Sequence, residues 1–148
     1  MARSRRRLAG DAWGALLQVH AALVPELDKE LRRRTGLPLA WYDVLLELRA
    51  APEHRLTMSE LGDRVVLSRS RVSRVVDELV REGLVAREVN PTDARSAYAV
   101  LTATGLTRFT EAAPVYVSGI EQRFAAGLSE SELRTLAEVL QRVRERQA

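Results

Sequence analysis

The sequence of 148 residues predicts a mainly α-helical fold that carries one small β-hairpin, and three observations support this. Apolar residues recur at helical spacing near both ends of the chain. Two helix start signals lie close together in the middle, at Thr57 and Ser68. Two short runs typical of β-strands, residues 84–89 and 97–101, flank a turn-rich polar loop, which indicates a hairpin.

Composition excludes several classes of protein. The chain has no cysteine, which excludes disulfides, thiolate metal sites and sensing by cysteine oxidation. Its two histidines, His20 and His54, lie far apart in the sequence, so we expect no metal site and no cofactor. No apolar run approaches the roughly 18 residues that span a bilayer, and no apolar segment follows the basic N-terminus as a secretory signal requires. We therefore expect a cytoplasmic protein without membrane contact.

The net charge of +3 comes from the N-terminus. Arg3, Arg5, Arg6 and Arg7 are four of the 23 basic residues, and the remaining 19 are balanced by 20 acidic residues. The body of the protein is therefore close to neutral, and an argument for nucleic-acid binding must rest on the local placement of charge. We expect residues 1–10 to form a disordered basic arm, either solvated or in contact with DNA phosphates.

Helices are predicted at both ends of the chain. Residues 8–34 carry apolar side chains at helical spacing, and Pro25 inside this segment predicts a kink or the start of a second helix. After Thr102 the pattern is helical again, with a kink expected at Pro114. A capping box at residues 129–132 then starts a final helix with one apolar face.

The middle of the chain predicts a winged helix-turn-helix. Residues 39–50 form a helix, and the sequence TMSE, which begins at Thr57, is a capping box that starts a second, short one. Ser68 is a candidate N-cap for a further helix over residues 69–81, and Gly83 supplies its stop signal. A short helix, a tight turn and a second helix followed at once by a hairpin is the winged arrangement.

The predicted helix over residues 68–81 has two distinct faces. At 100° per residue, five apolar residues cluster on one face: Val72, Val75, Val76, Leu79 and Val80. The N-terminal turns otherwise carry only serine and arginine: Ser68, Arg69, Ser70, Arg71, Ser73 and Arg74.

That concentration of arginine favours DNA as the partner. Arginine near a helix N-terminus opposes the helix dipole by some tenths of a kcal/mol, which a bound polyanion offsets. In DNA-reading helices the N-terminal residues contact base edges, and arginine pairs with two acceptors on guanine. The alternative is a solvated helix face with arginines for solubility, which the neighbouring helix-turn-helix and hairpin make less favoured.

The hairpin loop, residues 90–96, places Asp93 two positions before Arg95. An arginine at such a tip can insert into a narrow minor groove, where the potential is most negative. The aspartate can hold the loop or orient the arginine. Taken alone, an ordinary Asx-type turn with an exposed arginine is the better explanation of the pair.

Between Leu56 and Gly105 the chain contains, in order, the runs LTMSELG, LSRSRVSRVVDELVREGLVAR, PTDARS and LTATG. This combination resembles the MarR family of bacterial transcriptional regulators. The resemblance implies a homodimer in which residues 11–36 and 105–148 form a helical dimerisation region. Residues 37–104 then form the DNA-binding lobe.

The resemblance also implies a partner and a site. The partner is double-stranded DNA with a pseudo-palindromic operator, whose half-sites lie about one helical turn, roughly 34 Å, apart. By position, the recognition helix is assigned Ser68, Arg69, Ser70, Arg71, Ser73 and Arg74. The wing pair is Asp93 and Arg95. Many members are repressors released by a small aromatic or anionic ligand, often phenolic, although the peroxide-sensing branch needs a cysteine that this chain lacks.

The resemblance places such a ligand between the dimerisation helices and the winged lobe. The aromatic and polar residues able to line that pocket are Trp13, His20, Trp41 and Tyr42. Core packing, with His20 on a helix face or at the dimer interface, explains the same residues and is the favoured interpretation.

Two other classes of function compete with DNA binding. The sequence has no nucleotide-binding glycine loop, no GxSxG and no cluster of metal ligands, so we do not expect an enzyme. The alternative is a winged-helix module that binds another protein and no DNA. Such a module needs exposed apolar residues where this chain has Ser70, Arg71 and Arg74, so DNA binding is favoured.

Overall fold

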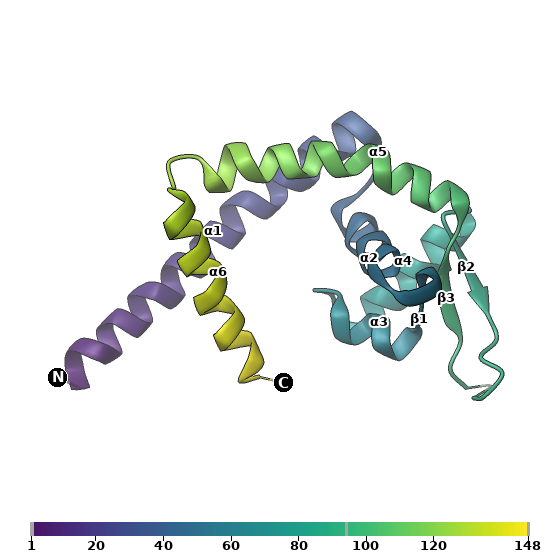
Figure 1. The fold of residues 1–148 in the computed structure, drawn as a ribbon, viewed down its shortest axis with the longest axis horizontal. Helices are drawn as coiled ribbons and strands as arrows, with labels where there is room; N and C mark the ends of the chain where they lie inside the picture. The colour runs from purple at the N-terminus through teal and green to yellow at the C-terminus, as the bar shows by residue number, and fades with distance from the viewer. Residues whose placement is uncertain (1, 94, 148) are drawn as a thin grey trace.

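The structure is a computed structural model that describes residues 2–93 and 95–147. A winged lobe lies on one side of the molecule, and the first half of the first helix lies with the last helix on the other side (Figure 1). Two long helices that pack together join the two sides. Helix α1 (Ala2–Thr35) packs against α5 (Ala103–Ile120), and α6 (Glu130–Glu145) turns back from the end of α5. Within the described residues, no helix is apolar enough over a sufficient length to cross a bilayer.

The lobe is built from short elements. In chain order these are α2 (Leu39–Ala50), the 3-10 helix η1 (Pro52–His54), β1 (Arg55–Thr57), α3 (Met58–Arg64), α4 (Arg69–Arg81), β2 (Val85–Glu88) and β3 (Tyr98–Leu101). The strands form one antiparallel sheet in the order β1-β3-β2, with Leu56 opposite Ala99 and Ala86 opposite Val100. The mainly α fold with a β-hairpin wing is therefore confirmed, and β1 adds a third strand to the hairpin.

The helix start signals lie where the sequence predicts them. In the capping box of α3, the Thr57 backbone N–H donates to Oε2 of Glu60 at 2.8 Å, and the Glu60 N–H donates to Oγ1 of Thr57 at 3.2 Å. Donation to the Glu60 carboxylate by the Thr57 backbone N–H, and then by the Thr57 hydroxyl at 3.1 Å, lowers the pKa of Glu60. Ser68 caps α4, and Gly83 ends it with a φ of 72°, which favours glycine.

Helix α1 differs from the expectation in two ways. It runs through Pro25 as one helix, so no second helix starts there, and residues 2–10 form its first turns where the sequence predicts a disordered arm. Arginine, alanine and leucine are strong helix formers, so the basic segment extends the helix that follows it. Beyond Pro25, the buried Leu27 and Leu31 hold α1 against the core, which offsets the hydrogen bond lost at the proline.

The C-terminal part of the chain is helical, as the sequence predicts. Helix α5 continues through Pro114 and changes character only afterwards, in the π-helical turn η2 (Glu121–Ala125). Gly105 in the first turn of α5 packs so closely that a Cβ there would collide with the carbonyl oxygen of Leu84. The glycine that ends the LTATG run therefore fixes α5 against the start of the wing.

One core joins the lobe to the long helices. Tyr42 of α2 is almost fully buried, and its ring lies 5.1 Å from that of Phe109 and 4.8 Å from that of Tyr116, both on α5. Leu45 and Leu79 are buried beside them, from α2 and α4. This shared core sets the position of α4 relative to α1 and α5.

Candidate nucleic-acid interface

Helix α4 presents its serines and arginines to solvent. Val72, Val75, Val76 and Leu79 are buried, and Val80 is half-buried against the same core. The remaining residues of the N-terminal turns are all exposed: Ser68, Arg69, Ser70, Arg71, Ser73 and Arg74. The structure therefore leaves all six predicted recognition residues exposed on the N-terminal turns of α4, with Arg69 and Ser73 on one side of the helix and Arg71 and Arg74 on the other.

The C-terminal half of α4 is held from two sides. Asp77 accepts a 2.6 Å hydrogen bond from the guanidinium of Arg87 on β2. Glu78 accepts a 2.8 Å hydrogen bond from the indole N–H of Trp41 on α2. Both acids are on the helix that carries the arginines, and their partners fix its orientation to the wing and to α2.

The N-terminal half of α4 carries three arginines, one of which pairs with an acid. Arg69 pairs with Asp63 of α3 at 3.2 Å. The guanidinium groups of Arg71 and Arg74 make no hydrogen bond or ion pair to any residue that the structure describes. An anion that approaches the first two turns of α4 therefore meets two unneutralised charges and the positive end of a helix.

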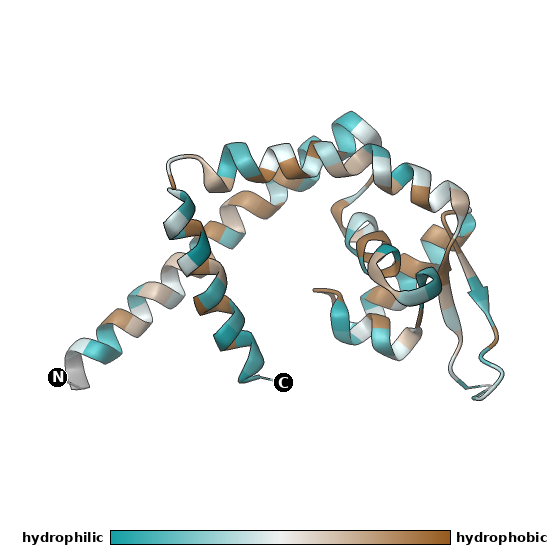
Figure 2. Ribbon diagram, in the orientation of Figure 1, coloured by the Kyte–Doolittle hydropathy of each residue, from teal (hydrophilic) through white to brown (hydrophobic). Residues whose placement is uncertain are grey.

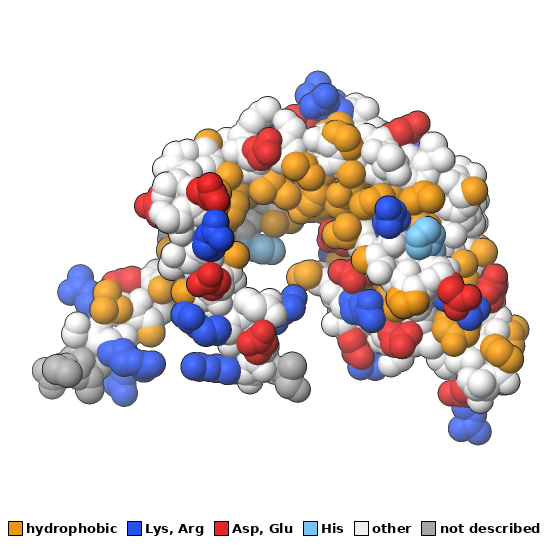
Figure 3. Space-filling view, in the orientation of Figure 1, with side chains coloured by type: hydrophobic (Ala, Val, Ile, Leu, Met, Phe, Trp, Pro, Cys, Tyr) orange, Lys and Arg blue, Asp and Glu red, His pale blue; other side chains and the backbone are white. Residues whose placement is uncertain are grey.

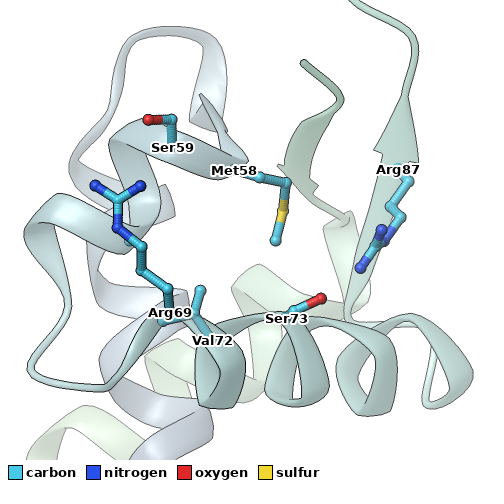
Figure 4. Close-up of a pocket in the computed structure, with 7 residues that line it drawn as sticks. Met58, Ser59, Arg69, Val72, Ser73 and Arg87 are labelled. Atoms are coloured by element: carbon cyan, nitrogen blue, oxygen red, sulfur yellow. The ribbon is translucent and has the colours of Figure 1, made fainter. Parts of the chain in front are cut away.

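A groove runs between α3, α4 and β2, with a volume of about 320 Å³ (Figure 4). Met58 and Val72 form its apolar middle, and Arg69 and Arg87 lie on opposite sides of it. Ser73 points into the same space. The groove connects α4 to the wing strand β2, and each of its two arginines is paired with an acid, Arg69 with Asp63 and Arg87 with Asp77.

The wing loop is held by its own side chains. The Asp93 carboxylate accepts a 3.0 Å hydrogen bond from the backbone N–H of Arg95, so the aspartate holds the loop and does not pair with the arginine side chain. Oδ1 of the buried Asn90 accepts bonds from the N–H and hydroxyl of Thr92, at 3.0 and 2.8 Å. Arg95 is exposed, with its side chain available to a partner.

The four residues proposed for a ligand pocket are not brought together. Trp13 is 60% exposed on α1, and Tyr42 belongs to the core. Trp41 is half-buried and bound to Glu78. His20 is the one member of the set that borders the larger cavity described next.

That cavity has a volume of about 530 Å³ and lies between α1, α2, α5 and the loop before α4. Asp43 of α2 and Tyr116 of α5 line it, together with Arg71 from α4. Burial, and then the nearby Glu47, raise the pKa of Asp43 to about 6. Sequence reasoning missed Asp43, although its signal was present as the one acid in the otherwise apolar run LAWYDVLL.

Comparison with known proteins identifies the family. A model of the MarR family matches residues 35–96. Sco3205 from Streptomyces coelicolor, a MarR family transcriptional regulator solved in complex with DNA, is 32% identical, with a TM-score of 0.83 over 90% of this chain and 84% of that one. AbsC from the same organism, also of the MarR family, is 30% identical, with a TM-score of 0.83 over 93% and 92% of the two chains. The chain belongs to the MarR family.

The sequence relatives agree with this assignment. The regulator MhqR from Bacillus subtilis, described as an HTH-type transcriptional regulator, is 30% identical over 86 residues. The match covers 58% of this MarR-family chain and 59% of MhqR, so this chain spans little more than half the length of that relative. These relatives are transcriptional regulators, in agreement with the expectation that the chain is not an enzyme.

Sequence reasoning missed two further residues of this MarR-family lobe. Asn90 is the residue that organises the wing loop, and its signal was an asparagine directly before Pro91, a combination that starts turns. Glu78 had no signal, since its partner Trp41 lies 37 positions earlier in the chain.

Proposed function

We propose that the protein is a homodimeric, sequence-specific DNA-binding regulator that reads a pseudo-palindrome through α4 and the wing loop. The observation that carries this is the pair of open guanidinium groups, Arg71 and Arg74, on a helix whose other half is anchored to β2 and α2. An anchored helix with open cations at its N-terminal end is suited to enter a major groove. The likeness to Sco3205, which was solved with DNA, supports the same conclusion.

The wing supplies the second contact. Arg95 is exposed in the loop between β2 and β3, on a backbone held by Asp93 and Asn90. The hairpin extends beyond the helices of the lobe (Figure 1). A guanidinium carried on a held loop loses less freedom on binding than one on a loose loop. We place it in the minor groove beside the major groove that α4 enters.

A second copy of the chain is the partner of the long helices. Apolar residues of α1 are exposed in the lone chain: Leu8, Trp13, Leu16, Leu17 and Val19. Those of α6 follow the same pattern: Val139, Leu140 and Val143. Figure 2 shows apolar residues along α6, and Figure 3 shows a band of them on the concave side beneath α5. Exposed apolar area on this scale marks an interface, and a symmetric dimer covers it.

Repression relieved by a small ligand is the mode of regulation that we favour. The cavity beside Asp43 is large enough for a small aromatic molecule, and Arg71 borders it while also belonging to the exposed face of α4. A ligand there contacts the side chain that DNA needs, which links the two binding events.

The experiment that tests the function is a selection from random duplex DNA by the purified protein at about 150 mM salt. An enriched inverted repeat with half-sites about 10 base pairs apart supports a dimeric reader of sequence. Retention without enrichment, and binding that fades smoothly as salt rises, reduces the contact to charge alone. That result favours the alternative, a winged-helix module that binds another protein.

A further inference from the structure

A second basic cleft lies on the opposite side of α4 from the groove of Figure 4. It has a volume of about 380 Å³ and is formed where the end of α1 and the start of α2 meet α4. Its lining residues are Arg32, Pro38, Ala40, Trp41, Arg71, Arg74, Val75 and Glu78. Three guanidinium groups thus face one carboxylate, and that carboxylate is already bound to Trp41.

Arg32 is oriented by an internal contact that leaves its outer nitrogens unused. Its Nε donates a 2.8 Å hydrogen bond to Oδ2 of Asp28, and its side chain remains 55% exposed. Oδ1 of Asp28 accepts the backbone N–H of Leu39 at 2.8 Å, which ties the carboxylate to the start of α2. The two terminal nitrogens of Arg32 make no bond with any part of the chain that the structure describes.

The floor of the cleft suits an oxyanion. Pro38 and Ala40 carry small side chains, so an anion can come close to the first turn of α2. In the first turn of α2 the backbone N–H of Leu39 donates to Asp28 and that of Trp41 donates to the carbonyl of Pro38, so the N–H of Ala40 is the donor that an anion can reach. Arg71 and Arg74 approach from the α4 side, one turn apart. The cleft therefore combines three guanidinium groups, one of them held by Asp28, with the start of a helix.

DNA is the source of anion that this position favours. Arg71 and Arg74 belong both to the cleft and to the exposed face of α4, so the cleft continues the surface proposed to read DNA. When α4 lies in a major groove, the sugar–phosphate backbone at the rim of that groove runs beside the helix. Backbone contacts of this kind fix the register of the protein on the duplex.

We propose that Arg32, with Arg71 across the cleft from it, binds a phosphate of the DNA backbone beside the groove that α4 enters, which leaves Arg74 to reach the base edges. Arg32 is then a DNA contact contributed by α1, outside the helix-turn-helix and the wing. This inference rests on the proposed function and extends it, since a contact from α1 links the dimerisation helix directly to the DNA.

The chain offers a matched control next to Arg32. Arg33 lies on the same helix with the same charge, yet it borders a different surface, beside Glu26 and Glu30. The test uses full-length Arg32→Gln and Arg33→Gln proteins. Affinity for the selected duplex is measured by fluorescence anisotropy between 50 and 300 mM KCl, together with the thermal unfolding midpoint of each protein.

For Arg32→Gln we expect a dissociation constant raised about three- to tenfold, and a slope of log affinity against log salt that is smaller by about one per half-site. The loss is expected to be equal on a mismatched duplex, because phosphates carry no sequence information. Arg32→Lys keeps the charge and is expected to keep the wild-type slope. Arg33→Gln is also expected to behave as wild type.

Three results overturn the proposal. In the first, Arg32→Gln keeps the wild-type slope of log affinity against log salt. In the second, Arg33→Gln reduces that slope as much as Arg32→Gln does. The third is tight, Arg32-dependent binding of inorganic phosphate to the free protein at constant ionic strength, combined with an unchanged DNA slope, which makes the cleft a small-anion site. Wild-type protein that binds no duplex at all overturns the proposed function as well, so the two failures are distinguishable.

Discussion

The indole N–H of Trp41 donates a 2.8 Å hydrogen bond to the carboxylate of Glu78, across 37 positions of sequence. The bond joins α2 to the second half of α4 and is partly shielded from solvent. Because α2 belongs to the shared core with α5, this bond couples the orientation of the proposed reading helix to the long helices. It therefore serves both the stability of the lobe and the placement of Arg71 and Arg74.

We expect Trp41→Phe to lower the free energy of unfolding by about 1–2 kcal/mol, because the ring is largely retained while Glu78 loses its donor. Urea unfolding at pH 7 measures this, at fixed protein concentration. The double variant Trp41→Phe with Glu78→Gln is expected to cost less than the sum of the two single changes. Strictly additive losses contradict an energetic role for the bond.

Arg74 is expected to read a base. We predict that Arg74→Ala weakens binding to the selected operator by about 1–3 kcal/mol and weakens binding to unrelated DNA much less. Competition titrations with both duplexes give the two numbers. Arg81→Ala, at the opposite end of α4, removes the same side chain from the same helix and is expected to have little effect on specificity. Equal losses on both duplexes reduce Arg74 to a phosphate contact.

Arg95 is expected to sense the width of the minor groove. In Arg95→Ala the loop should keep its fold, since Asp93 binds the backbone of residue 95 and not its side chain. The predicted loss of affinity is therefore a direct loss, and it is expected mainly on operators with A·T-rich flanks. Binding to operators with varied flanks measures it. A loss independent of flank sequence contradicts groove-width reading.

The exposed apolar side of α6 is expected to lie in the dimer interface. Val143 is 53% exposed in the lone chain, and Val143→Glu introduces a charge that a buried interface cannot solvate. We predict a shift from dimer to monomer in sedimentation equilibrium. Gln141→Glu adds the same charge at an exposed position about half a turn away and is expected to leave the dimer intact. A dimeric Val143→Glu protein contradicts this interface.

Most of the lobe could be predicted because its signals are local. The capping box of Thr57 and Glu60 and the stop at Gly83 depend on a few neighbouring residues, and each lies where the sequence places it. The two faces of α4 follow from helical periodicity alone. The recognition surface could therefore be assembled from sequence, although its role in DNA binding stays a prediction.

The misses share a different cause. The continuity of α1 through Pro25 depends on packing against α5, some 80 or more residues later in the chain. The bond between Trp41 and Glu78, and the burial of Asp43, depend in the same way on contacts between distant segments. Local patterns carry no information on such contacts, so the cavities could not be predicted even where their residues were noticed.

Asp43 gives a prediction about pH. Burial, and secondarily Glu47, raise its pKa from 3.8 to about 6, so the folded protein holds this proton more tightly than the unfolded chain does. Its contribution to stability is fully present below about pH 4 and is lost as the pH rises through about 6. A shift of two units corresponds to at most about 3 kcal/mol, and solvent screening of this half-buried group reduces the expected effect to about 1 kcal/mol.

Asp43→Asn is therefore expected to be more stable than the wild type at pH 7.5, because the neutral amide has no charge to desolvate. That advantage should shrink as the pH falls from 6 towards 4, where the wild-type carboxyl is itself protonated. Urea unfolding across this range measures both trends, and Glu138→Gln on the exposed surface of α6 controls for the loss of one negative charge. If Asp43→Asn gains the same free energy of unfolding over the wild type at pH 7.5 and at pH 4, the gain comes from packing and not from ionisation of the Asp43 carboxyl.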